Sequence, residues 1–216
     1  MNKLPSTRDL SGAVLAAMIA CPLSAFAEAK GLYEAIRGSK FNDAPVLQSN
    51  GIEFGGWMEV GVTANPHGPD DETNGPVTFN RDANEVEMNE FYGFIERVAP
   101  TDSGWSLGFR ADILYGTDAR FSSTSNLDDE FFNADNYKLV FPQTYAELYI
   151  PVGNGLTTKI GHFYTIIGYE VVTASDNFFF SHAYTMQYAE PFTHTGVLMS
   201  YALNDNWSLS GGVVSG

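Results

Sequence analysis

The feature that most constrains this sequence is a run of eleven residues, from Trp105 to Tyr115, in which side-chain character alternates. The odd positions are all apolar, whereas the even positions are mostly small or charged. Alternation with a period of two is typical of a β-strand that has one apolar and one polar face. The run exceeds the roughly five or six residues common in soluble sheets and matches the about 9–11 that cross a bilayer. It therefore predicts a membrane-crossing strand.

Six further segments fit the same template less regularly, which gives seven predicted strands. In the first strand, Trp57 and Glu59 fall on the polar side. The second strand has two competing apolar faces, which a β-bulge would reconcile. The seven predicted ranges are 52–63, 86–98, 105–115, 144–152, 156–166, 193–203 and 207–213.

Short and long connections alternate strictly between these segments. The short ones are rich in Pro, Gly, Asn and Asp, the residues that tight turns favour. A transmembrane barrel has short periplasmic turns and long external loops. The alternative is a soluble lipocalin-like barrel, for which we can derive no reason that the loops at one end should be consistently longer than those at the other. The short connections are 99–104, 153–155 and 204–206, and the long ones are 64–85, 116–141 and 168–190.

Four aromatic residues on the apolar face lie where the predicted strands end. Trp105 and Trp207 follow short turns, Tyr201 precedes a short turn, and Tyr115 precedes a long loop. Amphipathic rings favour the level of the lipid headgroups. These residues are therefore candidates for two aromatic girdles, and the alternative is that they belong to the core of a soluble sandwich.

Composition and motifs exclude several functions. Only 11 Lys and Arg oppose 26 Asp and Glu, so the chain is a poor candidate for nucleic-acid binding. An aromatic content of 14% is too high for a disordered chain, and one Cys excludes a disulfide scaffold. The four His show no metal-ligand spacing, and no nucleophile or phosphate-binding motif is present. No catalytic residue, cofactor or metal site is predicted, and the chain is not expected to be an enzyme.

The N-terminal residues predict export. Lys3 and Arg8 precede a short apolar stretch at 11–20, and an A-x-A cleavage pattern follows at 25–27. The alternative is a membrane anchor, but the apolar stretch is well below the ~20 residues that span a bilayer. The segment after cleavage forms either a short helix or a disordered leader, and no function is assigned to it. The predicted divisions are a signal peptide at 1–27, a leader at 28–50 and the barrel at 51–216.

Charged residues on the polar face indicate what the barrel encloses. The candidates for lining a pore are Glu59, Arg110, Asp112, Glu147 and Lys159. Burying unpaired charge in a dry core is costly, whereas water in the lumen removes that cost. A water-filled barrel with charges of both signs is a channel. The alternative is a narrow barrel in which the charges pair and plug the lumen, and Arg110 with Asp112 is a candidate for such a pair.

Three runs of the sequence resemble one family, the putative beta-barrel porin type-two family of bacterial outer-membrane proteins. They are 107–121, 163–172 and 188–198, and the resemblance extends from about Gly55 to the end of the chain. The resemblance implies an antiparallel outer-membrane barrel that acts as a pore. Members of that family are longer than this chain.

An odd number of strands predicts that the barrel is incomplete. Bacterial single-chain barrels use an even number, and an open sheet leaves unpaired backbone groups in lipid. We therefore expect further strands after Gly216. The predicted fold is an all-β, antiparallel transmembrane β-barrel of the outer-membrane type, with about seven of its strands in this chain.

The predicted function is passive diffusion of small hydrophilic solutes or ions across the bacterial outer membrane. Outer-membrane lipid and these solutes are the predicted partners, nucleic acid is not, and a homo-oligomer is compatible with the sequence. Two alternatives remain open. One is a structural or surface-recognition barrel with a closed lumen, and the other is an outer-membrane lipid hydrolase.

Overall fold

The computed structural model describes residues 31–102, 104–123, 133–134 and 136–215. The predicted signal peptide at 1–27 and the middle of the predicted loop 116–141 lie outside these residues. The chain divides into two compact units, 1–40 and 41–216. The described part of the first unit contains α1 (Leu32–Arg37), which ends at Gly38 with a φ of 75°. A left-handed φ of this kind favours glycine at a helix end.

The second unit opens with two short helices, η1 (Phe41–Asp43) and α2 (Pro45–Asn50). Pro45 occupies the first turn of α2, where a missing backbone N–H removes no helical hydrogen bond. Asn42 joins this segment to the first strand, because its Nδ2 donates to the Phe54 carbonyl and its Oδ1 accepts from the Phe54 N–H, both at 2.9 Å. Among the described residues, no helix is long and apolar enough to cross a membrane.

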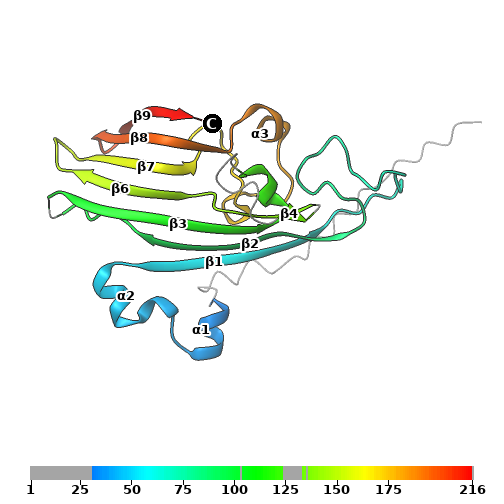
Figure 1. Cartoon of the computed structure of the whole chain (residues 1–216), viewed down its shortest axis with the longest axis horizontal. Coiled ribbons are helices and arrows are strands. Elements are labelled where there is room, and N and C mark those ends of the chain that lie inside the picture. The colour runs from blue at the N-terminus through cyan, green and yellow to red at the C-terminus, as the bar shows by residue number, and fades with distance from the viewer. Residues whose placement is uncertain (1–30, 103, 124–132, 135, 216) are drawn as a thin grey trace, which may run out of the picture. The chain divides into compact units, whose positions relative to one another are not determined.

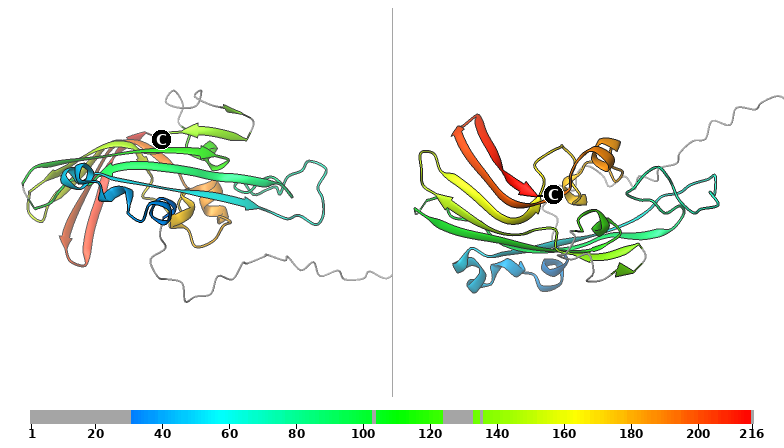
Figure 2. Two further views of the ribbon diagram at one scale, coloured as in Figure 1. Left: turned by 90° about the horizontal axis from the view of Figure 1, so that it is seen from below. Right: turned by 45° about the horizontal axis from the view of Figure 1, so that its top comes forward.

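One antiparallel sheet forms the main body of the unit, and the strands of its main path follow one another in chain order (Figure 1). Its main path has seven strands, which confirms the predicted all-β antiparallel fold. Within the described residues β1 pairs only with β2 and β9 only with β8, so the curved sheet in Figure 2 is open, as an incomplete barrel requires. The strands are β1 (Glu53–Val62), β2 (Val86–Arg97), β3 (Ser106–Gly116), β6 (Thr144–Ile150), β7 (Leu156–Tyr164), β8 (Thr193–Asn204) and β9 (Trp207–Ser215).

Two further strands, β4 (Asn133–Ala134) and β5 (Tyr137–Val140), lie where the sequence predicted only a loop. β5 pairs with the end of β3, placing Val140 opposite Leu114. The loop prediction was wrong here because the last residues of β3 need backbone partners, which β5 supplies. Pro142, which has no N–H to donate, separates β5 from β6.

A β-bulge in β2 reconciles its two competing faces. Glu59 of β1 lies opposite Glu90, but the next residue, Val60, lies opposite Met88. Asn89 is therefore the extra residue. The bulge allows Asn89 and Glu90, although adjacent in sequence, both to be buried on the inner side of the sheet.

A hydrophobic core cluster lies on the inner side of the sheet and not between two sheets. Tyr92 of β2 and Leu114 of β3 contribute to it from the strands. The rest comes mainly from the long connections, which contain η2 (Asp118–Phe121), η3 (Ala174–Asp176) and α3 (Tyr184–Ala189). The long connections thus fold back against the sheet, which the sequence did not predict. The other buried members are Phe79, Ala119, Val140, Val172 and Met186.

Candidate functional site

The inner face of the sheet carries the candidate site, and the alternation of burial along the strands identifies that face. In β3, Phe109 and Ile113 are exposed, whereas Asp112 and Leu114 are buried. In β1, Trp57 stacks on the inner Tyr92 ring with 4.1 Å between centroids. The outward side chains of β1 are exposed, as the sequence predicted for lipid-facing positions: they include Met58, Val60 and Val62.

Arg110 and Asp112 form the centre of a paired network on this face. The Arg110 Nε lies 2.8 Å from Asp112 Oδ1, and Nη1 lies 2.9 Å from Glu96 Oε2. Asp112 also accepts hydrogen bonds from the Tyr92 hydroxyl and, at 2.8 Å, from Gln143 Nε2. The Asp112 side chain is 0% exposed, so this inward-facing carboxylate has no contact with solvent.

Glu147 and Lys159 lie opposite one another on β6 and β7 and are only partly buried. Glu147 Oε1 accepts from the Ala99 N–H at 3.0 Å, and Lys159 Nζ lies 4.5 Å from the centroid of the Tyr145 ring. The ion pairs in the described part of the chain include neither Glu147 nor Lys159. Both residues are therefore partly exposed charged groups outside the ion pairs of the described chain.

A second group of charges is acidic. Carboxylate oxygens of Glu59, Glu90 and Asp118 all lie within 4.8 Å of one another. Glu90 is 0% exposed, and its Oε2 accepts from Trp57 Nε1 at 2.5 Å and from the Ala174 N–H at 3.1 Å. Burial, followed by the charges of Glu90 and Glu59, raises the pKa of the Asp118 carboxyl well above its usual range. Of these three residues, the sequence singled out only Glu59.

Sequence reasoning missed this cluster for two reasons. Glu90 lies beside the bulge of β2, so the alternation there did not assign it to a face. Asp118 belongs to a long connection, and nothing in the spacing of the sequence places that connection against β1 and β2. The one feature of the sequence that could have pointed to the cluster is that residues 86–98 have two competing apolar faces, which indicates a bulge near Glu90.

The long connections cover part of the inner face and hold each other in place. Gln187 Oε1 accepts from the Thr78 N–H at 2.6 Å and from the Thr78 hydroxyl at 2.9 Å. The Phe79 ring stacks on His182 and on Phe121, with centroids 3.9 and 4.1 Å apart. Residues from three long connections thus form one packed layer over the inner face.

The four girdle candidates differ in their surroundings. Trp105 and Trp207 are 67% and 70% exposed. The Tyr201 hydroxyl accepts from the Asn154 N–H of a short turn at 3.2 Å, and the Tyr115 ring lies 5.9 Å from that of Tyr137. A role for these residues at the headgroup level stays a prediction.

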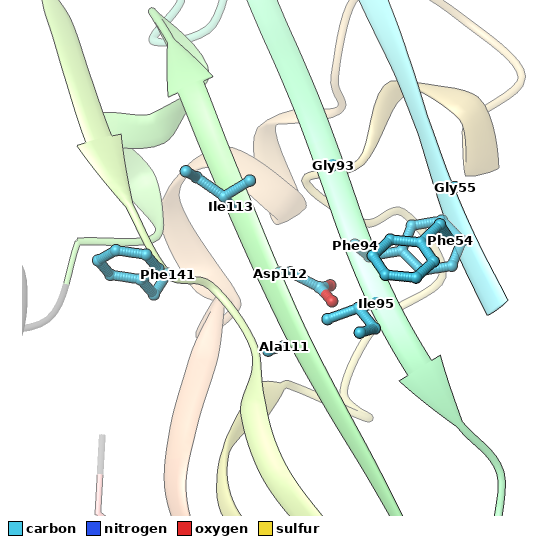
Figure 3. A pocket seen from close by; sticks show the side chains of 9 residues that line it. All are labelled: Phe54, Gly55, Gly93, Phe94, Ile95, Ala111, Asp112, Ile113 and Phe141. Atoms are coloured by element: carbon cyan, nitrogen blue, oxygen red, sulfur yellow. The ribbon is translucent and has the colours of Figure 1, made fainter. Parts of the chain in front are cut away.

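The outer face carries a shallow apolar groove of about 370 Å³ over β1, β2 and β3 (Figure 3). Gly93, which lies opposite the outward Ile113, leaves room for it. On the inner face, the Phe94 ring occupies the space where a Gly55 side chain would begin. Its apolar outward lining suits hydrocarbon and not a hydrophilic solute. The outward-facing lining residues are Phe54, Gly93, Ile95, Ala111 and Ile113. The lining also includes Phe141 and the inward-facing residues Gly55, Phe94 and Asp112 of the same strands.

The comparison with protein families decides what this sheet belongs to. The family described as "Putative beta-barrel porin-2, OmpL-like" matches residues 51–216, which are most of the chain. The chain belongs to this porin family. The resemblance read from the sequence is thereby confirmed, and a general role as an outer-membrane porin barrel follows from it. Comparisons with curated proteins and with solved structures found no match.

Proposed function

We propose that this porin-family chain forms part of the wall of a channel through which small hydrophilic solutes or ions diffuse passively across the outer membrane. The observation that carries the proposal is that Glu147 and Lys159, two partly exposed charged residues outside the ion pairs of the described chain, lie on an inner face whose outward neighbours are apolar. Such groups are stable only beside water. Selection of solutes would then follow from the width of the lumen and its charge, with no chemical reaction.

A barrel with a closed lumen is the second candidate, and a specific observation favours it. The long connections pack over the inner face, and the Arg110 network is fully paired. Both features reduce the space open to solute. A channel and a closed barrel differ in whether water-soluble reagents reach the inner face from solution.

The experiment measures conductance of the purified protein in a planar bilayer, with single cysteines introduced in a Cys21→Ser background. Lys159→Cys faces inward, and the adjacent Ile160→Cys, half exposed on the outer face, is its matched control. We expect conductance steps in both variants. A water-soluble, positively charged thiol reagent should reduce the steps of Lys159→Cys and leave those of Ile160→Cys unchanged.

Each other outcome contradicts the proposal. Absence of steps in correctly assembled protein would favour the closed barrel. Equal sensitivity of the two cysteines would mean that the inner and outer faces are assigned wrongly. Turnover of phospholipid by the same preparation would favour the lipid hydrolase instead.

A further inference from the structure

Three carboxylates from separate parts of the chain converge on the inner face. Glu59 comes from β1, Glu90 from β2, and Asp118 from η2, the helical turn that follows β3. Their oxygens lie within 4.8 Å of one another, and Glu90 and Asp118 are 0% and 3% exposed. Like charges at this separation repel each other unless a proton or a cation lies between them.

The hydrogen bonding of the cluster leaves oxygen atoms without donors. Glu90 Oε2 is occupied by Trp57 and Ala174, but Glu90 Oε1 is buried and has no partner. Asn89, which is 1% exposed, likewise has one side-chain atom with a hydrogen-bond partner and one without. Its Nδ2 donates to the Thr117 hydroxyl, next to Asp118, while its Oδ1 is buried without a donor. A buried acceptor that lacks a partner is costly, and the orphaned Glu90 Oε1 belongs to one of the three carboxylates, so it indicates that the cluster lacks a partner.

Among the residues that the structure describes, no side-chain cation is hydrogen-bonded to these oxygens. The three ion pairs in the described ranges join Arg81 with Asp82 and Arg110 with Glu96 and Asp112, all outside the cluster. Arg120 lies on the same helical turn as Asp118, but its Nη2 donates to the Thr78 carbonyl at 2.6 Å. Within the described ranges, the three carboxylates thus have no hydrogen-bonded cation, and the charge of Arg120 acts on Asp118 without an ion pair between them.

We propose that Glu59, Glu90 and Asp118 bind one calcium ion on the inner face. Hard oxygen ligands suit both Ca²⁺ and Mg²⁺, but Mg²⁺ demands regular octahedral geometry, whereas Ca²⁺ accepts an irregular shell. The three carboxylates come from two strands and a helical turn, with oxygens that all lie within 4.8 Å of one another. An irregular set of this kind suits the larger and more flexible shell of Ca²⁺. The ion would join the β1–β2 wall to the connection after β3, whether or not the barrel conducts.

Terbium luminescence and calorimetry test the proposal on purified, folded protein treated with a chelator. Tb³⁺ also prefers oxygen ligands, and the indole of Trp57, bonded to Glu90, would transfer energy to a lanthanide bound beside it. We expect tryptophan-sensitised Tb³⁺ emission that added Ca²⁺ displaces. Calorimetry should show one Ca²⁺ per chain and weaker binding of Mg²⁺.

Isosteric variants identify the ligands. Glu90→Gln and Asp118→Asn should each lower Ca²⁺ affinity by at least about tenfold, since even indirect partners of a metal contribute that much. Glu53→Gln, an exposed acidic residue on the same strand as Glu59, is the control and should bind as the wild type does. Heat-modifiable mobility on a gel would establish that each variant is folded.

Two results would overturn the proposal. If the folded wild type binds no Ca²⁺ at neutral pH, the carboxyls carry protons instead. If Glu90→Gln and Asp118→Asn bind Ca²⁺ as tightly as Glu53→Gln, the ion occupies the acidic loops and not this cluster.

Discussion

Asp112 shows that a residue facing inward is not necessarily a residue facing water. Its alternation with Phe109 and Ile113 assigned the correct face, and a charged residue there was expected to line the lumen. Its side chain is instead 0% exposed and accepts bonds from three neighbours. A substitution tolerated in a wet lumen, such as Asp112→Arg, would here place a second cation beside Arg110 in a buried site.

The milder change Asp112→Asn measures how much this network contributes to the free energy of unfolding. Removing one partner of a buried ion pair costs about 3–5 kcal/mol. We expect the lower end, about 3 kcal/mol, because Arg110 keeps its contact with Glu96. The measurement is the free energy of unfolding in denaturant, in detergent or lipid. Asp102→Asn, in an exposed turn, is the control and should change it by less than about 0.5 kcal/mol. Equal effects of the two changes would mean that Asp112 is solvated.

At the scale of elements, the strands assign neighbouring residues to opposite environments. Val197 and Leu198 are adjacent in β8, and in the alternation Val197 faces outward and Leu198 inward. They lie opposite Ile160, which is half exposed on the outer face, and Lys159, which is on the inner face. Residues side by side at one depth make a matched pair for testing the face that lipid covers.

We predict that Val197→Arg impairs assembly and that Leu198→Arg is tolerated. A charge at the midplane costs about 2–4 kcal/mol on the lipid face of a barrel and much less on a watery inner face. Heat-modifiable electrophoretic mobility after refolding into lipid vesicles reports assembly. If Leu198→Arg fails and Val197→Arg assembles, the assignment of faces is reversed.

How much of the fold could be predicted from the sequence depends on whether a feature is set by neighbouring residues or by contacts between distant ones. Strand positions and faces could be predicted, because alternation is a local property, and β1 and β3 follow it closely. The packed connections could not, because contacts such as Gln187 with Thr78 join residues far apart in the chain. The acidic cluster could not be predicted for two reasons. A bulge interrupts the alternation at Glu90, and Asp118 comes from a turn that is distant in the chain from Glu59 and Glu90.

At the scale of the whole molecule, the distribution of charge is the property most relevant to transport. The connection 65–85 holds five acidic residues and one basic residue, and 168–190 holds three acidic residues and no basic one. Part of this charge is already compensated, since Arg81 lies 3.0 Å from Asp82. The remaining excess of negative charge belongs to the connections at one end of the strands.

Negative charge at the mouth of a channel concentrates cations within about a Debye length, ~10 Å at 0.1 M salt. We therefore predict a mild preference for cations, weakened by Lys159 on the inner face, that fades as the salt concentration rises. The reversal potential in a salt gradient measures it. Lys159→Gln should increase the preference because it removes the opposing charge, whereas Ile160→Val, its outward neighbour, should not alter it. Anion preference at low salt, or a preference that does not change with salt, would show that the acidic connections do not control which ions enter.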